Sequence, residues 1–164
     1  MTVAGALAGC SGGGGNGGNG GNGGDNGGNN GGNNGGNNTT TSGGASASVP
    51  SEVDTYLSNN NANLYEGNAV DKTGQDTVTV TVGAGEQNYA FKPVAVKVSK
   101  GTTVEWVWGG KLSHNVIATD GTFKSDLHST AGVHFSYTFE NAGNYTYFCR
   151  PHKALGMVGA IIVE

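Results

Sequence analysis

One short stretch near the end of the chain combines three side chains that bind soft metal ions. Cys149, His152 and Met157 lie close together in sequence and offer a thiolate, an imidazole and a thioether. Thiolate and thioether are soft ligands that favour copper, especially Cu(I). Zinc prefers Cys and His in tetrahedral sites and has no use for a thioether. This donor set therefore predicts a copper site, with zinc as the main competing metal.

A second histidine is needed to complete such a site, because two imidazoles, one thiolate and a weak axial Met form the blue-copper arrangement. His114 lies 35 residues before Cys149, at the start of an expected strand. Two or three intervening strands over those 35 residues would bring Cys149 back beside His114. Each residue alone has an ordinary interpretation, since free Cys and Met are common in cores. Their combination favours a metal site, whereas we interpret His128 and His134 as surface or strand residues.

The elements that must position these side chains are predicted to be short β-strands. Thr77–Val82 alternates threonine with valine, as a half-buried strand should. Val94, Val96 and Val98 share one face of the next strand. Further strands are expected over 104–108, 114–117, 134–139, 145–149 and 157–163, and one or two helical turns over 53–57 with Ser51 as N-cap. Short strands with regular turns and almost no helix indicate an all-β sandwich or barrel.

Together these motifs resemble one family of metalloproteins. His114-Asn115-Val116, followed by Cys-x₂-His-x₄-Met, closely resembles the cupredoxins, the type 1 blue copper proteins. The nearest group is the halocyanins, small membrane-attached proteins of halophilic archaea. The resemblance covers nearly the whole domain, including residues 137–140, 143–145 and 156–159.

The resemblance implies a cupredoxin-like Greek-key β-sandwich or barrel that holds one copper ion. His114, Cys149 and His152 would bind equatorially and Met157 axially. Asn115 would form a hydrogen bond across the site and hold the two ligand loops together. Arg150 departs from the small hydroxyl residue often found after the cysteine, so the usual partner of Asn115 is absent.

Two features of the ligand loop carry further expectations. Pro151 has no N–H and cannot donate to the Cys149 sulfur, which predicts a less oxidising site than one with a donor there. By resemblance, the edge of His152 is exposed in an apolar docking patch supplied by Ala154, Leu155 and Gly156. The alternative is that Leu155 simply fills a gap.

The resemblance implies a one-electron carrier rather than an enzyme. The chain has ligands for only one metal site, which disfavours an accessory subunit of a copper oxidase. It has only two methionines, which disfavours a copper storage or delivery protein. We expect a monomer that meets membrane redox proteins transiently, as electron donor and acceptor. Residues 51–164 carry 11 acidic and 8 basic side chains, a balance that excludes nucleic acid as a partner.

The N-terminal part of the chain has a different composition. Leu7-Ala8-Gly9-Cys10 resembles a lipobox, the lipidation signal of prokaryotic lipoproteins, although no basic residue precedes it and the apolar stretch is short. A chance run of small residues is the alternative. Residues 11–50, rich in Gly and Asn, are predicted to be a disordered linker before a domain at 51–164. Lipidation of Cys10 would then anchor the domain to the lipid membrane, on the extracytoplasmic face of the cell membrane.

Overall fold

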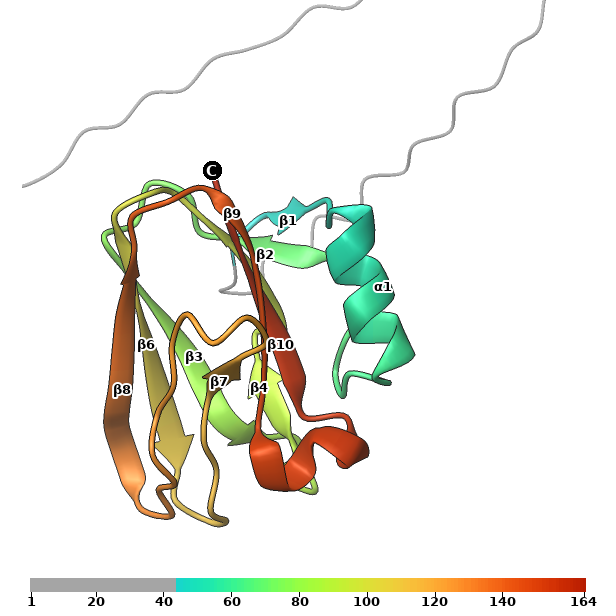
Figure 1. The fold of residues 1–164 in the computed structure, drawn as a ribbon, viewed down its shortest axis with the longest axis vertical. Helices are drawn as coiled ribbons and strands as arrows, with labels where there is room; N and C mark the ends of the chain where they lie inside the picture. Colours follow the sequence, from blue (N-terminus) through green and yellow to red (C-terminus); the bar gives the residue numbers. More distant parts are fainter. Residues whose placement is uncertain (1–43) are drawn as a thin grey trace, which may run out of the picture. The chain divides into compact units, whose positions relative to one another are not determined.

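The computed structural model describes residues 44–164, and β-strands predominate in this range (Figure 1). The strands are β1 (Ser46–Ala47), β2 (Ala69–Asp71), β3 (Thr77–Ala84), β4 (Ala90–Lys92), β5 (Ala95–Val98), β6 (Thr102–Gly109), β7 (Ile117–Ala118), β8 (Ala131–Phe139), β9 (Gly143–Phe148) and β10 (Val158–Val163). The helices are α1 (Ser51–Asn59) and the 3₁₀-helix η1 (Arg150–Leu155).

The strands form two sheets, as predicted for a sandwich. Sheet A has the order β1-β2-β5-β10-β9-β7, and sheet B has the order β4-β3-β6-β8. β10 runs parallel to β5 and antiparallel to β9, while β3 runs parallel to β6. Parallel neighbours cannot be joined by a tight hairpin, so the chain crosses between the sheets several times. Segments far apart in sequence therefore meet at the sheet ends.

Alternation in β3 and β6 builds the core between the sheets. The valines of β3 are buried, and the threonines between them are exposed. β6 contributes Val104, Trp106 and Trp108 to the same core. Trp106 is fully buried and packs against the rings of Phe123 and Tyr147. Each fully buried side chain of this kind contributes about 1.5–3 kcal/mol relative to an exposed one, which makes this core a stiff support.

Helix α1 packs on sheet A through a second apolar cluster. Its buried residues Val53 and Leu57 contact a group of side chains that includes Val94, Val158 and Ala160. The helix is longer than predicted, and Ser51 is not its N-cap. The cap is the residue before, Pro50, whose carbonyl accepts the first helical bond from the Asp54 N–H at 3.0 Å.

Two strand predictions are wrong in detail. Val94 does not share a core with Val96 and Val98, because β5 begins only at Ala95 and Val94 joins the cluster under α1. The strand expected over 114–117 forms only at Ile117–Ala118. His114 instead makes an isolated bridge with His128 outside the strands.

The predicted linker at 11–50 overlaps the folded part of the chain. β1 pairs antiparallel with β2, Ser46 opposite Val70, so ordered structure begins before residue 51. Backbone hydrogen bonding to a free sheet edge compensates for the polar composition there. The proposed signal, including Cys10, lies outside the described residues. Within 44–164, no helix is both long enough and apolar enough to cross a membrane.

Candidate metal centre

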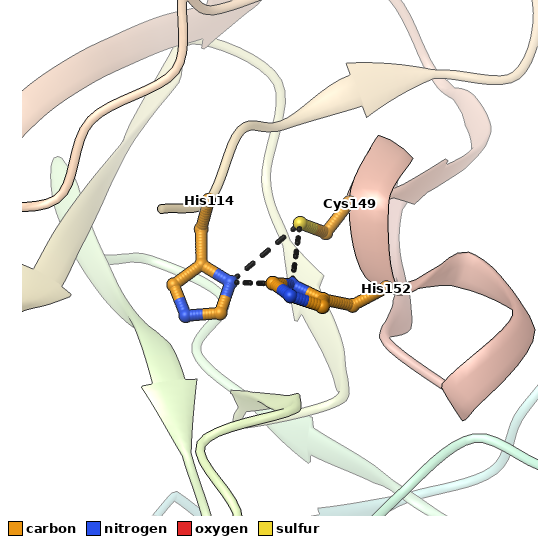
Figure 2. Close-up of side chains that lie close together, drawn as sticks. All are labelled: His114, Cys149 and His152. Carbon is orange, nitrogen blue, oxygen red and sulfur yellow. Dashed lines mark hydrogen bonds between the residues drawn. The ribbon is translucent and has the colours of Figure 1, made fainter. Parts of the chain in front are cut away.

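Three predicted ligands from distant parts of the chain converge at one end of the sandwich. Figure 2 shows the side chains of His114, Cys149 and His152 turned toward one another. The Cys149 Sγ lies 3.6 Å from His114 Nδ1 and 3.5 Å from His152 Nδ1, and the two nitrogens are 3.1 Å apart. The point in their plane that is equidistant from the three atoms lies about 2.0 Å from each, close to the metal–nitrogen distances of about 2.0–2.1 Å and somewhat shorter than the metal–sulfur distance of about 2.3 Å in zinc sites. The triangle of donor atoms is therefore close to the size that encloses one transition-metal ion.

His114 is held in a buried position by β6 and by the loop before β8. The indole N–H of Trp108 donates to the His114 carbonyl at 3.0 Å. His114 and His128 exchange two backbone hydrogen bonds, each of 3.0 Å. Only 2% of His114 is exposed, and burial lowers its pKa to about 4, with His152 adding to the shift. A neutral imidazole at ordinary pH is the form that binds a metal.

Gly83 makes room for the His114 ring. It lies in an irregular part of β3 with φ of +82°, a conformation that favours glycine. A Cβ at this position would come within 2.9 Å of His114 Nε2. No side chain larger than hydrogen fits there without moving the ring.

Cys149 follows directly after β9 and is fully buried. Burial raises the pKa of its thiol, and the nearby backbone N–H groups of Asn115 and His152 offset this rise only in part. A metal ion must therefore displace the proton, since the thiolate is the form that binds.

His152 lies on η1 and is only half-buried. The ring of Tyr89 packs against it with 4.7 Å between ring centroids. Burial lowers the pKa of His152, in the same direction as for His114. The two histidines therefore present similar nitrogen donors from very different surroundings.

Met157 is completely buried just before β10, in the same core cluster as Cys149. Its carbonyl accepts the Cys149 N–H at 3.0 Å, and its own N–H donates to the His152 carbonyl at 3.2 Å. The backbone of Met157 is thus bonded to both neighbouring ligand positions. Its role as axial ligand stays a prediction.

Asn115 forms a bond across the site, although Arg150 replaces the expected hydroxyl residue. The Asn115 Oδ1 accepts the backbone N–H of Arg150 at 2.8 Å, and the Arg150 side chain is exposed. A backbone donor is present whatever the side chain is, so this bond joins the two ligand loops without a hydroxyl group.

The predicted docking patch is only partly exposed. Ala154 and Leu155 are exposed, whereas Gly156 is buried, so its assignment to the patch is wrong. Gly156 is covered by the segment after α1, and a Cβ there would lie 2.3 Å from the Asn61 carbonyl. Nothing in the loop sequence indicated that another part of the chain covers it.

Sequence reasoning missed several residues around the site. Tyr89, Asn63, Gly83 and Trp108 contact the ligands or their loops from other elements. The expected strand over 104–108 included Trp108 but gave no sign of its bond to His114. His128 and His134 were expected to be surface or strand residues; His134 lies on β8, and the two half-buried rings stack on each other with 4.3 Å between centroids, outside the donor triangle.

One soft sulfur donor with two imidazole nitrogens in a β-sandwich defines a copper-binding protein of the blue-copper class. Comparison with known proteins gives the same class. A family model for copper-binding proteins of the plastocyanin/azurin family matches residues 78–164. The chain belongs to this family, and copper is its cofactor.

Individual copper proteins are also similar to this chain. Halocyanin from Natronomonas pharaonis is 45% identical over 115 residues, which make up 68% of this chain and 71% of that protein. Plastocyanin from Scenedesmus fuscus is 34% identical over 97 residues, covering 53% of this chain and 99% of its own length. Among solved structures, a mutant plastocyanin of a fern aligns with a TM-score of 0.47 and 27% identity, over 53% of this chain and all of the fern protein.

Proposed function

We propose that this chain is a one-electron carrier with one mononuclear copper ion. His114, Cys149 and His152 would hold the ion, and Met157 would be a fourth, weak ligand. The triangle of donor atoms is the observation that supports this most directly. Bound copper exchanges one electron between Cu(II) and Cu(I).

The surroundings of the donors suit this role because they restrict movement. The Asn115–Arg150 bond joins the two ligand loops, and the Cys149–Met157 backbone bond joins the ends of β9 and β10. A donor set held by rigid elements needs little rearrangement when the charge of the ion changes.

The route for electrons is the half-buried edge of His152. Leu155 beside it is 51% exposed. Leu64 is 52% exposed and directly follows Asn63, whose side chain donates to the Leu155 carbonyl. These leucines and Ala154 form an apolar surface for brief contacts, as in redox encounters. The Lys153 ammonium lies 4.5 Å from the centre of the Phe148 ring, and with exposed Arg150 it favours an acidic partner. We propose membrane redox proteins as donor and acceptor, and a monomeric carrier.

Copper titration tests the proposed site. Adding Cu(II) to purified protein should give an intense visible thiolate-to-metal charge-transfer band at one ion per chain. One equivalent of a one-electron reductant should then remove the band, and an oxidant should restore it. A colourless loaded protein would contradict the assignment, and rapid copper loss to a weak chelator would favour storage or delivery instead.

A pair of surface variants tests the docking surface. Leu155→Ser should slow electron exchange with redox partners several-fold at an unchanged reduction potential, because it removes apolar contact area only. Val133→Ser is the matched control, since Val133 is similarly exposed at 53% but lies on β8, away from η1 (Figure 1). Equal slowing in both variants would exclude a specific patch around Leu155.

The N-terminal motif supports a proposed membrane tether. Lipidated Cys10 would hold the domain at the extracytoplasmic face of the cell membrane through the Gly/Asn-rich stretch that follows. In a prokaryotic host with lipoprotein processing, the chain should fractionate with membranes, and Cys10→Ala should release it without altering the copper band. Equal membrane retention of both forms would show that Cys10 is not the anchor.

A further inference from the structure

The segment after helix α1 bonds to the loop that carries His152. Asn63 makes three hydrogen bonds there. Its backbone N–H donates to the Gly156 carbonyl at 3.0 Å, and its side-chain Nδ2 donates to the carbonyls of Leu155 at 2.6 Å and Tyr89 at 2.8 Å. We propose that Asn63 is a positioning residue that fixes the His152 loop, an inference that rests on the proposed role of His152 as a copper ligand.

The side-chain amide joins both sides of the exposed ligand. An NH₂ group has two hydrogens, so it can satisfy two carbonyls at once. One of these carbonyls belongs to the end of η1, which carries His152, and the other belongs to Tyr89, whose ring packs on His152. A single Asn63 side chain therefore sets the spacing between the ligand and the ring that covers it.

Gly156 shows how closely the two segments fit. Its φ is +82°, and a Cβ would lie 2.3 Å from the Asn61 carbonyl and 3.2 Å from Asn63 Nδ2. The Gly156 N–H closes η1 by donating to the Lys153 carbonyl at 3.0 Å. The backbones of Gly156 and Asn61 approach closely, so the end of the His152 loop is part of the contact with the segment that carries Asn63.

Helix α1 gives this contact a rigid base. Val53 and Leu57 are fully buried against sheet A, and the Leu57 carbonyl accepts the Ala62 N–H at 3.0 Å, one residue before Asn63. The match to the copper-binding family covers residues 78–164, so α1 and Asn63 lie before it. Helix α1 and Asn63 thus support the one proposed ligand that is half-exposed.

The metal-free protein provides the first test. Hydrogen exchange at the Gly156 and Met157 amides reports opening of the loop, because both N–H groups bond within or beside η1. Asn63→Ala and Asn63→Asp remove the two side-chain donors and should speed this exchange about fivefold or more, as expected for lost hydrogen bonds. Asn68→Ala, an exposed residue of the same segment, is the matched control and should leave it unchanged. Unchanged exchange in both Asn63 variants would overturn the proposal.

The copper-loaded protein provides the second test. The Asn63 variants should lose Cu(II) to a chelator several-fold faster than wild type and show an altered charge-transfer band, and Asn68→Ala should do neither. A loosened loop with wild-type copper loss and an unchanged band would overturn the positioning role. If wild-type protein gave no band, the electron-carrier function would fail, and the metal-free exchange would still decide whether Asn63 holds the loop.

Discussion

His114 and His152 face the same sulfur at almost the same distance, yet the fold holds them in opposite ways. His114 is buried behind Trp108 and bridged to His128. His152 is half-exposed on η1, against Tyr89. The difference shows how one site can be both rigid and accessible. One histidine fixes the ion to the core, and the other brings its ring edge to the surface where a partner can reach it.

Removing the sulfur that both histidines face should have the largest effect. Cys149→Ser replaces a soft thiolate donor by a hydroxyl that is not ionised at neutral pH, so the intense visible band of the copper protein should disappear. Absorption spectra after Cu(II) addition measure this. Cys10→Ser is the matched control and should keep the full band. A band that survived in Cys149→Ser would remove the basis for comparing the two histidines.

Replacing each histidine by glycine should separate their surroundings. In His152→Gly, added imidazole should restore the band, because the ring it replaces reaches the surface. In His114→Gly it should not, because that position is closed by Trp108 and the Gly83 segment. The measurement is an imidazole titration followed by visible absorption. Equal restoration in both variants would mean that the two positions are equally accessible.

Acid should destabilise the metal-free protein mainly through His114. Its pKa is near 4 when folded and about 6.5 when unfolded, so between these values the unfolded chain binds more protons and stability falls as the pH drops. The loss is at most ~3 kcal/mol and is complete below about pH 4. Urea unfolding from pH 7 to 4 measures it. His114→Gln should flatten this pH dependence more than His152→Gln, and the reverse order would contradict the contrast in burial.

The smallest expected effect comes from Pro151, which has no N–H to donate to the Cys149 sulfur. Pro151→Ala supplies an N–H that can donate to the Cys149 thiolate, a bond worth about 1 kcal/mol, or ~40 mV for one electron. The reduction potential should therefore rise, as cyclic voltammetry can measure. Ala154→Ser in the same 3₁₀-helix is the control and should leave it unchanged. An unchanged or lower potential in Pro151→Ala would count against the argument.

The sequence predicted much of the scaffold correctly because local patterns carried the information. Alternation identified β3, the strand expected over 104–108 lies within β6, and loop residues supplied the expected donors Cys149 and His152. Errors arose where a distant segment decided the local structure. His114 lies in an isolated bridge instead of a strand because its partner, His128, comes from another loop. Gly156 is buried because the segment after α1 lies over it.

By itself, the sequence determined the donor types and the β-rich framework, since side-chain chemistry and strand periodicity are local properties of the chain. Tertiary structure alone decided how each donor is held. Gly83 makes room for the His114 ring from 31 residues away, and Asn63 bonds to the His152 loop from 92 residues away. Such contacts depend on which sheet edges and loops meet in space, and a residue type does not encode its partner across that distance.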